Sequence, residues 1–450
     1  MRRTEPYDLF VIGAGPGGYT AALLGAKRGM RVGIAEASNL GGTCTNTGCI
    51  PAKSYIESVN LLDRLKNAQR FGIESTDASL SLESLHRRKT RIVARLVKGI
   101  EHLLVSSGVD IYRAHASFES ANSIRVGDAL VASRATIVAT GSRPKRPAIF
   151  SLEGVMTSDD IFELKQIPAS LVVVGGGVIG LEMAHIFSHL GSEVTVVEAL
   201  ERVLATEDEE VSKALVALYR KVRFITSARI TSVERDIGFN LDVQTPGGME
   251  ALTGQGLLLS IGREPLIPEG LVSLGLEMNA SGGARVDAVM RTSIPGVFAI
   301  GDATGEHMYA YVASKEAAVA VDCIAGGSMK MDYSAIPSIV FTSPEIASVG
   351  RRPNASRARK GAFPVSALGR ARTMEASEGF ASVYTDMEGK MERVTIMAPH
   401  ATELISWAAL AVEKKMHLED FLKPYYPHPT MAELVREAAE DCLGVCINKT

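Results

Sequence analysis

Cys44 and Cys49, in the segment GGTCTNTGCIPAK (residues 41–53), are the pair whose type and spacing most directly indicate chemistry. In an ideal α-helix a step of five residues rises about 7.5 Å, which exceeds the roughly 4.4–6.8 Å between the Cα atoms of a disulfide. If the two sulfurs are to bond, the backbone must leave the regular helix between them, and Asn46 and Gly48 permit this. Two buried thiols or a pair of metal ligands are the alternatives.

A histidine near the end of the chain could exchange protons with such thiols. His428 is followed by Pro and Thr, and Glu433 comes five residues later. Histidine is the side chain whose unperturbed pKa of about 6.5 suits proton transfer near neutrality, and a carboxylate can orient it. We therefore expect His428 and Glu433 to form an acid–base pair for thiol chemistry. A purely structural histidine is the alternative.

Two glycine-rich turns indicate dinucleotide binding. In GxGxxG the first glycine makes a tight turn, the second lets a pyrophosphate approach, and the third lets helix and strand pack closely, while the helix N-terminus offers free N–H groups. The glycines are Gly13, Gly15 and Gly18 in the first copy, and Gly175, Gly177 and Gly180 in the second, offset by 162 residues. Each copy begins after a predicted strand and opens a predicted helix, so we expect two βαβ units. Two helix starts without a ligand are the alternative.

An acidic residue closes the second predicted strand of each βαβ unit. Glu36 and Glu198 both lie 23 residues after the first glycine, placed to accept a hydrogen bond from a ribose hydroxyl. A carboxylate suits the free 2′-hydroxyl of NAD and repels the 2′-phosphate of NADP. Arg202 is the one nearby cation, and Glu198 and Glu201 oppose it. The second unit is therefore expected to bind NAD.

A second pair of similar segments follows the two βαβ units. Residues 136–144 (TIVATGSRP) and 257–265 (LLLSIGREP) both predict a buried strand, a glycine turn and a proline. The residues at these two turns are further candidates for cofactor binding: Thr140, Gly141, Gly262 and Arg263.

Composition excludes several classes of protein. The 450 residues are 46% apolar and 22% charged, which is unlike a disordered chain, a collagen or a coiled coil. The net charge is −3 (48 basic against 51 acidic residues), so nucleic acid is not expected as a partner. The apolar runs are far shorter than the ~20 residues that span a bilayer, and we expect neither a membrane segment nor a signal peptide. Five cysteines are too few for a secreted disulfide scaffold, which favours a cytoplasmic enzyme.

Other possible ligands are expected to be unimportant for chemistry. His185 and His189 lie four apart on a predicted helix, which is metal-ligand spacing, but no third ligand is evident. We therefore expect packing or surface residues, and no metal site. Cys323 is expected to be buried in a helix over 313–324, and Cys442 and Cys446 match no functional motif.

Periodicity outlines the remaining elements. An amphipathic helix is predicted over 80–107, and alternation predicts strands within 110–135 and 225–260. From residue 335 the pattern changes to an α+β domain, with strands predicted within 338–350 and 380–394 and helices over 402–414 and 431–439.

These motifs resemble those of the pyridine nucleotide–disulfide oxidoreductase family over nearly the whole chain. The most specific segments are GGTCTNTGCIPAK, GGGVIGLE, TSIPGVFAIGDAT and PHPTMAE. The resemblance implies an α/β fold with two Rossmann-like domains, for FAD and NAD, and a C-terminal α+β dimerisation domain. The implied domains are 1–147 (FAD, first part), 148–270 (NAD), 271–334 (FAD, second part) and 335–450 (dimerisation). The second subunit of a homodimer would complete the active site.

The resemblance also implies a role for single residues. Cys44 would exchange with substrate, Cys49 would lie against the flavin, and Lys53 would lie near flavin N5. The remaining roles concern positioning and proton transfer: Glu182 as ion-pair partner of Lys53, Asp302 after Gly301 on the ribityl chain, His428 as acid–base, and Glu433 as its orienting carboxylate.

The implied reaction moves two electrons from a dithiol, expected to be dihydrolipoamide, to NAD⁺. The lipoyl group would arrive on a partner protein of a 2-oxoacid dehydrogenase or glycine cleavage complex. The chain departs from the family pattern at Tyr311 and Tyr426, where histidines are usual, at Ala398, where glycine is usual, and over residues 351–361. Because Tyr311 and Tyr426 leave the identity of the disulfide substrate open, NADH-dependent reduction of another disulfide or of mercuric ion is an alternative. A flavin-binding partner protein without turnover is an alternative of a different class.

Overall fold

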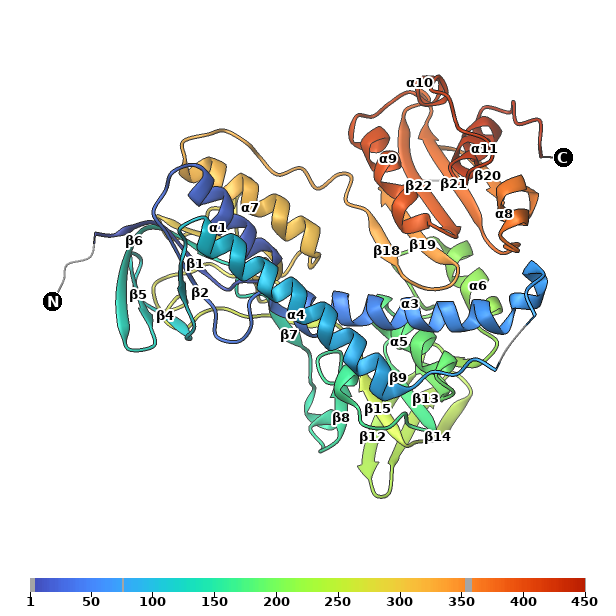
Figure 1. Ribbon diagram of the computed structural model, residues 1–450, viewed down its shortest axis with the longest axis horizontal. Coiled ribbons are helices and arrows are strands. Elements are labelled where there is room, and N and C mark those ends of the chain that lie inside the picture. The colour runs from blue at the N-terminus through green and yellow to red at the C-terminus, as the bar shows by residue number, and fades with distance from the viewer. Residues whose placement is uncertain (1–4, 75–76, 353–357, 450) are drawn as a thin grey trace.

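A computed structural model describes residues 5–74, 77–352 and 358–449, and it divides into two regions built on parallel sheets and a C-terminal region built on an antiparallel sheet (Figure 1). No helix in these described ranges is both long enough and apolar enough to cross a lipid bilayer. The predicted α/β class is confirmed. The predicted domain limits at residues 147, 270 and 334 stay a prediction.

The first region contains a mixed sheet in the order β3-β2-β1-β6-β5-β4, with β17 also paired to β6. Its parallel part joins β3, β2, β1, β6 and β17, and β4 and β5 continue it antiparallel. The strands are β1 (Tyr7–Ile12), β2 (Val32–Ala35), β3 (Asp110–Tyr112), β4 (Ala116–Ser120), β5 (Ser123–Val126), β6 (Ala129–Val138) and β17 (Val297–Ala299). Helices α1 (Pro16–Lys27) and α7 (Ala310–Ile324) pack against each other beside this sheet, and α7 confirms the helix predicted over 313–324.

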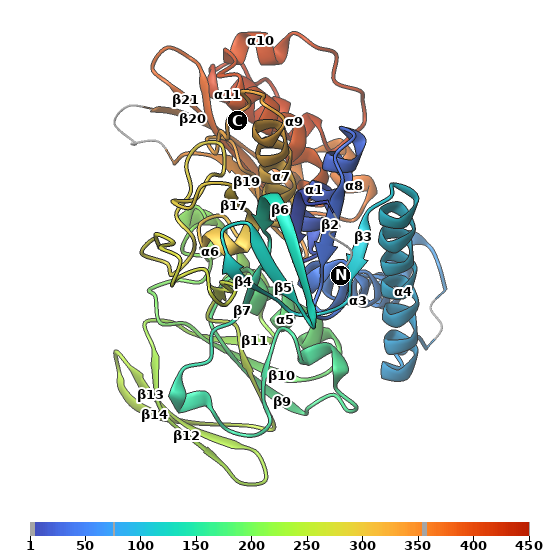
Figure 2. The same ribbon diagram turned by 90° about the vertical axis from the view of Figure 1, so that its left-hand side faces the viewer.

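The second region contains a fully parallel sheet in the order β11-β10-β9-β15-β8. Its elements are β8 (Val155–Thr157), β9 (Ser170–Val174), α5 (Val178–His189), β10 (Glu193–Val197), α6 (Glu209–Leu218), β11 (Val222–Ile225) and β15 (Gly256–Leu259). An antiparallel sheet of β12 (Arg229–Arg235), β13 (Phe239–Thr245) and β14 (Gly248–Gly254) lies at the opposite end of the molecule from the C-terminal region (Figure 2).

Two short strands join the two regions. β7 (Ser142–Pro144) and β16 (Arg263–Pro265) pair antiparallel, with Arg263 opposite Pro144. These strands follow Gly141 and Gly262, so the glycine turns of the two similar segments 136–144 and 257–265 lie side by side in the fold.

Helices connect the first region to its neighbours. They are α2 (Gly42–Asn46), α3 (Cys49–Lys66) and α4 (Leu82–Ser106). α4 confirms the amphipathic helix predicted over 80–107, and it begins where the Ser81 hydroxyl accepts a hydrogen bond from Ser84 N–H at 3.3 Å. α3 packs against both α4 and α5, which brings the cysteine segment to the second region.

The C-terminal region has an antiparallel sheet in the order β18-β19-β22-β21-β20, with α9 over β19 and β22 and α11 over β20 and β21. The elements are β18 (Ser338–Val340), β19 (Glu345–Gly350), β20 (Ala358–Pro364), α8 (Gly369–Thr373), β21 (Phe380–Asp386), β22 (Met391–Ala398), α9 (Ala401–Glu413), α10 (Leu418–Leu422) and α11 (Glu433–Cys442).

Three predicted elements in this region need correction. The strand predicted within 338–350 is two strands, because the Thr342 hydroxyl bonds the Pro344 carbonyl and turns the chain between them. The strand predicted within 380–394 is likewise two strands, β21 and β22, which pair antiparallel. The helix predicted over 431–439 spans Glu433–Cys442 instead, because residues 431 and 432 form a turn in which the Glu433 carboxylate accepts from Thr430 N–H at 3.0 Å. Residues 353–357, within the unusual segment 351–361, lie outside the described residues.

Candidate active site

The two glycine turns have the same geometry. Gly13 and Gly175 have φ values of 99° and 105°, in the left-handed region that favours glycine. A Cβ on Gly18 would collide with the carbonyl oxygen of Gly13, and a Cβ on Gly180 with that of Gly175. The first and third glycines of each motif are therefore required for the turn and for the packing of the helix on it.

The acidic residues predicted to bind ribose support these turns. Glu36 accepts from the N–H groups of Ala14 and Ser38, both at 2.8 Å. Glu198 accepts from Gly176 and Leu200 at 2.6 and 2.7 Å, which are the equivalent positions of the second copy. A carboxylate has about four acceptor positions, so each acid keeps capacity for a ribose hydroxyl.

The residues present fit two dinucleotides. α1 and α5 begin directly after Gly15 and Gly177, and neither helix has a side chain capping its first N–H groups. A Cβ on Gly15 would meet no atom closer than 4.0 Å, and a Cβ on Gly177 would meet none within that distance. Both helix N-termini therefore present free N–H groups to an open side, as a pyrophosphate requires.

The hydrogen bonds of Arg202, the cation nearest to Glu198 in sequence, argue against a role of this residue in binding a 2′-phosphate. Its Nη1 donates to the carbonyl oxygens of Leu204 and Glu207 at 3.2 and 2.9 Å, and to the Ser212 hydroxyl at 2.9 Å. Its Nη2 donates to the Ala205 carbonyl at 2.7 Å. Because these contacts occupy the guanidinium group, the geometry favours NAD over NADP.

Arg263 and Asp302 are joined through a serine. Arg263 donates to both the hydroxyl and the carbonyl of Ser142 at 2.8 Å, and the Ser142 hydroxyl donates to Asp302 at 2.5 Å. Arg263 also pairs with Asp159 at 3.2 Å. The structure thus gives Arg263 a positioning contact with the segment that carries Asp302. Thr140 donates to the Leu266 carbonyl, and Gly141 and Gly262 make the turns that pair β7 with β16.

Sequence reasoning missed the carboxylate that supports Gly301. Glu316 on α7 is buried, accepts from Gly301 N–H at 2.5 Å, and accepts from the Tyr333 hydroxyl at 2.8 Å. Burial raises the pKa of Glu316 to about 7, against the opposing effect of these two hydrogen bonds. An acidic residue among the alanines and valines of α7 was the signal that could have identified it.

The cysteine pair lies at the junction of two helices. α2 ends at Asn46, whose side-chain amide donates to the carbonyls of Leu40 and Gly42, and α3 begins at Cys49. The expected departure from a regular helix between Cys44 and Cys49 is confirmed. Both sulfurs are free thiols in the structure, which is the reduced form of such a pair.

The two thiols differ in acidity. Hydrogen bonding between them raises the pKa of Cys44, and burial adds to this effect. The same hydrogen bond lowers the pKa of Cys49 to about 7, assisted by the positive charge of Lys53 and opposed by burial. Cys49 is therefore the more acidic thiol of the pair.

Lys53 is fixed by a carboxylate from another region of the fold. Its Nζ lies 2.9 Å from both carboxylate oxygens of Glu182, the partner that the sequence suggested. The Phe341 N–H donates to Glu182 at 3.1 Å, and the Phe341 ring centroid lies 4.5 Å from Lys53 Nζ. The contribution of Phe341 was not predicted, because a main-chain donor has no sequence signature.

His428 and Glu433 form the expected pair in the C-terminal region. His428 Nδ1 lies 3.0 Å from Glu433 Oε1, and the His428 side chain is 76% exposed while Glu433 is 7% exposed. Among the described residues, no hydrogen bond or ion pair joins His428 to Cys44 or Cys49. His428 lies between α10 and α11 of the C-terminal region, whereas the cysteine pair lies at the junction of α2 and α3 (Figure 1).

The two tyrosines that replace usual histidines both have partners. The Tyr311 hydroxyl donates to the Pro337 carbonyl, and its ring stacks on Tyr309 with centroids 5.3 Å apart. The Tyr426 hydroxyl donates to the Phe421 carbonyl at 2.6 Å, and its ring packs edge-on against Trp407. Tyr426 is therefore held against the core of the C-terminal region.

His185, His189 and Cys323 have structural surroundings. His185 is buried between Asn60 and Tyr219, at 2.7 and 3.0 Å, and His189 bonds the His185 carbonyl. This confirms the packing role expected for His185. Cys323 is buried, as expected.

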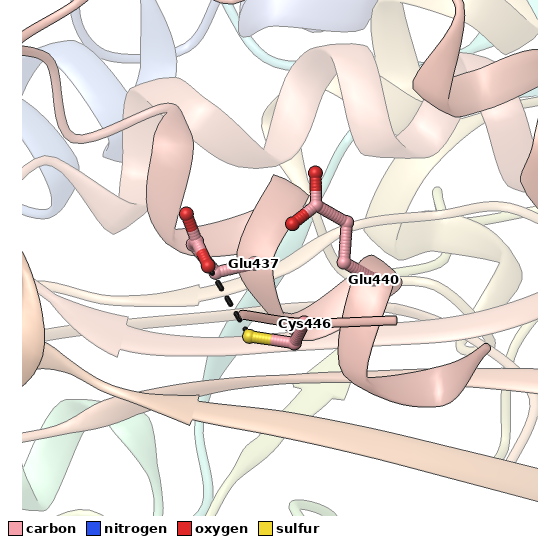
Figure 3. Close-up of side chains that lie close together, drawn as sticks. All are labelled: Glu437, Glu440 and Cys446. Carbon is pink, nitrogen blue, oxygen red and sulfur yellow. Dashed lines mark hydrogen bonds between the residues drawn. The ribbon is translucent and has the colours of Figure 1, made fainter. Parts of the chain in front are cut away.

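A cluster of Glu437, Glu440 and Cys446 at the C-terminus has metal-ligand proximity, and Cys446 points at Glu437 (Figure 3). The Cys446 thiol donates to Glu437 at 3.2 Å, and Arg436 pairs with both glutamates. The pKa values of Cys442 and Cys446 are both raised, chiefly by burial. Since Arg436 and the Cys446 thiol already bond these carboxylates, we assign no metal or redox role to this cluster.

Comparison with known proteins gives matches over nearly the whole chain. Residues 7–317 match the family described as pyridine nucleotide-disulphide oxidoreductase, and residues 336–439 match the dimerisation domain of that family. Dihydrolipoyl dehydrogenase of Chlamydia trachomatis is 35% identical over 97% of this chain and 96% of its own length. Dihydrolipoyl dehydrogenase of Geobacillus stearothermophilus is 34% identical over 98% and 97%.

Solved structures agree with these matches. LpdA from Mycobacterium tuberculosis superposes with a TM-score of 0.87 at 28% identity, covering 96% of this chain and 99% of that protein. The HOCl-induced flavoprotein disulfide reductase RclA from Escherichia coli superposes with a TM-score of 0.86 at 25% identity, with the same coverage.

Proposed function

The chain belongs to the pyridine nucleotide-disulphide oxidoreductase family, and from this membership we propose that it oxidises dihydrolipoamide to lipoamide with NAD⁺ as acceptor. It is a flavoprotein disulfide oxidoreductase that uses FAD and NAD. The observation that carries the proposal is the unequal thiol pair Cys44–Cys49, held beside the partly buried Lys53–Glu182 ion pair.

The thiol steps follow from the acidity of the pair. A substrate thiolate attacks the Cys44 sulfur of the oxidised pair, a substrate–Cys44 disulfide forms, and Cys49 leaves as thiolate. A pKa of about 7 makes Cys49 the better leaving group. The second substrate thiol then attacks the substrate sulfur bonded to Cys44, which releases the cyclic disulfide and the Cys44 thiol.

We propose that His428 moves the protons in these steps. Its Nε2 would accept a proton from a substrate thiol and return it to Cys44, while Glu433 at Nδ1 fixes the tautomer and stabilises the protonated ring. Because His428 is exposed on the C-terminal region, it would serve the cysteine pair of the partner subunit. The protein is a homodimer through this region, whose sequence matches the dimerisation domain.

The cofactors are held by the two turns. We propose that FAD lies on the Gly13–Gly18 turn with Glu36 at its ribose and Asp302 at its ribityl chain, and that NAD lies on the Gly175–Gly180 turn with Glu198. When bound, FAD supplies the two-electron carrier between the dithiol and NAD⁺. The protein residues contribute orientation, the charge of Lys53 and the acidity of Cys49.

We also propose a lipoyl-bearing protein of a 2-oxoacid dehydrogenase or glycine cleavage complex as partner, supported by the dihydrolipoyl dehydrogenase relatives. A cytoplasmic location is proposed with it, because a thiol pair that cycles between two redox states suits a reducing compartment.

A steady-state assay with dihydrolipoamide tests the proposal, with NAD⁺ and NADP⁺ compared side by side and Cys44→Ser as control. We expect NAD⁺ reduction that the variant loses. No turnover with dihydrolipoamide, in a protein whose flavin NADH still reduces, would overturn the substrate assignment and leave another disulfide or mercuric ion. No flavin reduction by either route would indicate a flavin-binding protein without turnover.

A further inference from the structure

The loop between β10 and α6, residues 198–208, connects the NAD turn to the C-terminal region. It begins at Glu198 and ends at Glu207 and Asp208, directly before α6, which lies beside the C-terminal sheet (Figure 1). Glu207 and Asp208, the two acids at the end of the loop, are both buried. The loop is held along its length by Arg202, and at its ends by the glycine turn and by the groups that neutralise these two carboxylates.

Arg393 on β22 supplies that neutralising charge. Its Nε lies 3.1 Å from Asp208 Oδ2, and its Nη2 lies 3.3 Å from Glu207 Oε2, with all three side chains no more than 7% exposed. Arg393 Nη1 also donates to the Gly350 carbonyl at 2.9 Å, which fixes the guanidinium plane. The arginine is thus held by its own sheet and aimed at the loop.

Other groups around Asp208 complete the cluster. The Thr395 hydroxyl donates to Asp208 Oδ2 at 2.6 Å, and the half-exposed Arg352 pairs with Oδ1 at 3.0 Å. Although burial works against ionisation, the Thr395 hydroxyl and the Arg393 guanidinium hold the pKa of Asp208 below its usual value. Arg393 is the buried cation of this cluster.

Main-chain contacts carry this attachment to the glycine turn. Glu207 N–H donates to the Leu204 carbonyl at 2.8 Å, and Leu204 N–H donates to the Gly176 carbonyl at 2.9 Å. Gly176 N–H in turn binds Glu198 at 2.6 Å. Leu204 has a φ of 45°, a conformation that a leucine keeps only where its surroundings impose it.

We propose that Arg393 is a positioning residue for NAD binding, acting from the C-terminal region through Glu207, Asp208 and Leu204 on the Gly175–Gly180 turn. Without its charge, the two buried carboxylates repel each other and the loop moves outward. The Leu204–Gly176 hydrogen bond then lengthens, and Gly176 and Glu198 lose the geometry that receives the adenosine ribose and pyrophosphate.

Binding of ADP-ribose to the FAD-loaded protein, measured by calorimetry, tests this without any turnover. ADP-ribose carries the adenosine ribose and pyrophosphate but cannot reduce the flavin. The variants are Arg393→Met, Arg393→Lys and Thr395→Val. The matched control is Lys360→Met, which breaks the exposed Lys360–Glu210 pair across the same boundary, at 2.6 Å.

We expect Arg393→Met to bind ADP-ribose roughly tenfold more weakly, Arg393→Lys to be intermediate, and Lys360→Met to match the unchanged protein. FAD content and the alkylation rate of Cys49 should not change, and KM for NAD⁺ should rise while kcat holds. If Arg393→Met does not fold, Thr395→Val tests the proposal instead, and we expect it to weaken ADP-ribose binding by a smaller factor. ADP-ribose affinity unchanged in every folded variant of Arg393 and Thr395 would overturn the proposal. The proposal rests on the proposed binding of NAD at the Gly175–Gly180 turn. Failure of dihydrolipoamide turnover would leave this binding measurement unaffected, so the two failures can be told apart.

Discussion

Glu182 on α5 receives the Lys53 ammonium group of α3 with both carboxylate oxygens, each 2.9 Å from Nζ. Glu182 is 4% exposed and Lys53 is 30% exposed, so the pair is mostly shielded from water. Phe341 N–H adds a contact from the C-terminal region. Three parts of the fold therefore meet one turn after Cys49, and the charge of Lys53 is held where it acts on the thiol pair.

Replacing Lys53 should make Cys49 less acidic. The hydrogen bond with Cys44 and the positive charge of Lys53 lower the pKa of Cys49 from an ordinary 9 to about 7, so Lys53→Met should move the pKa of Cys49 back toward its ordinary value. The pH profile of iodoacetamide alkylation of the reduced protein measures this value. Lys66→Met, at the exposed end of the same helix, is the control and should leave the profile unchanged; an unaltered profile in Lys53→Met would contradict the role of Lys53.

Mixed dimers should show that the active site is shared. Cys44→Ser and His428→Gln should each be inactive as homodimers, the second by roughly 10²–10⁴-fold. A heterodimer of the two contains one site with both residues intact, so co-expressed subunits with different tags should recover activity. Recovery is expected only if His428 serves the partner subunit, and a heterodimer as inactive as its parents would show that it does not.

Glu198 should set the choice of dinucleotide. In Glu198→Gln the charge that repels a 2′-phosphate is lost, and the acceptors for Gly176 and Leu200 are weakened. We expect KM for NAD⁺ to rise roughly tenfold and the preference for NAD⁺ over NADP⁺ to narrow. Glu201→Gln, three residues away and exposed, should change neither value. A preference that persists in Glu198→Gln would assign discrimination to another residue.

Glu316 should make stability depend on pH. Its pKa is raised from 4.5 to about 7 in the folded protein, so its contribution is fully present below pH 4.5 and is lost as pH rises through 7. The lost contribution is on the order of 3 kcal/mol. Glu316→Gln keeps the acceptor for Gly301 and removes the titration, so its Tm should fall less than that of the unchanged protein between these pH values.

The control for this comparison is Glu269→Gln, an exposed carboxylate for which we expect the pH dependence to stay as it was. Equal pH dependence of Tm in Glu316→Gln and the unchanged protein would contradict the raised pKa.

The local parts of the site were predictable from sequence. The glycine turns, the acids 23 residues later and the broken helix at the cysteines all follow from backbone geometry within one βαβ unit or one short segment. The turns and the acids recur with equivalent hydrogen bonds in both copies, from Ala14 N–H to Glu36 and from Gly176 N–H to Glu198.

Contacts between distant segments were not predictable from spacing. Arg393 meets Asp208 from 185 residues away, and Phe341 reaches Glu182 from 159 residues away. Such pairs depend on how the C-terminal region packs on the second region, and neither residue has a local pattern that distinguishes it. The packing of Tyr426 on Trp407 was equally unpredictable from the sequence, because it depends on the tertiary fold.

The most direct test of the central claim is to identify which cysteines dihydrolipoamide reduces. The isolated protein would be treated anaerobically with one equivalent of dihydrolipoamide, alkylated and mapped by mass spectrometry, with Cys323, Cys442 and Cys446 as internal references. We predict that Cys44 and Cys49 change from a disulfide to two alkylated thiols, with one lipoamide formed per pair, while the other three do not change. Cysteines 44 and 49 already alkylated before treatment, or still bonded after it, would contradict the assignment of this pair as the redox centre.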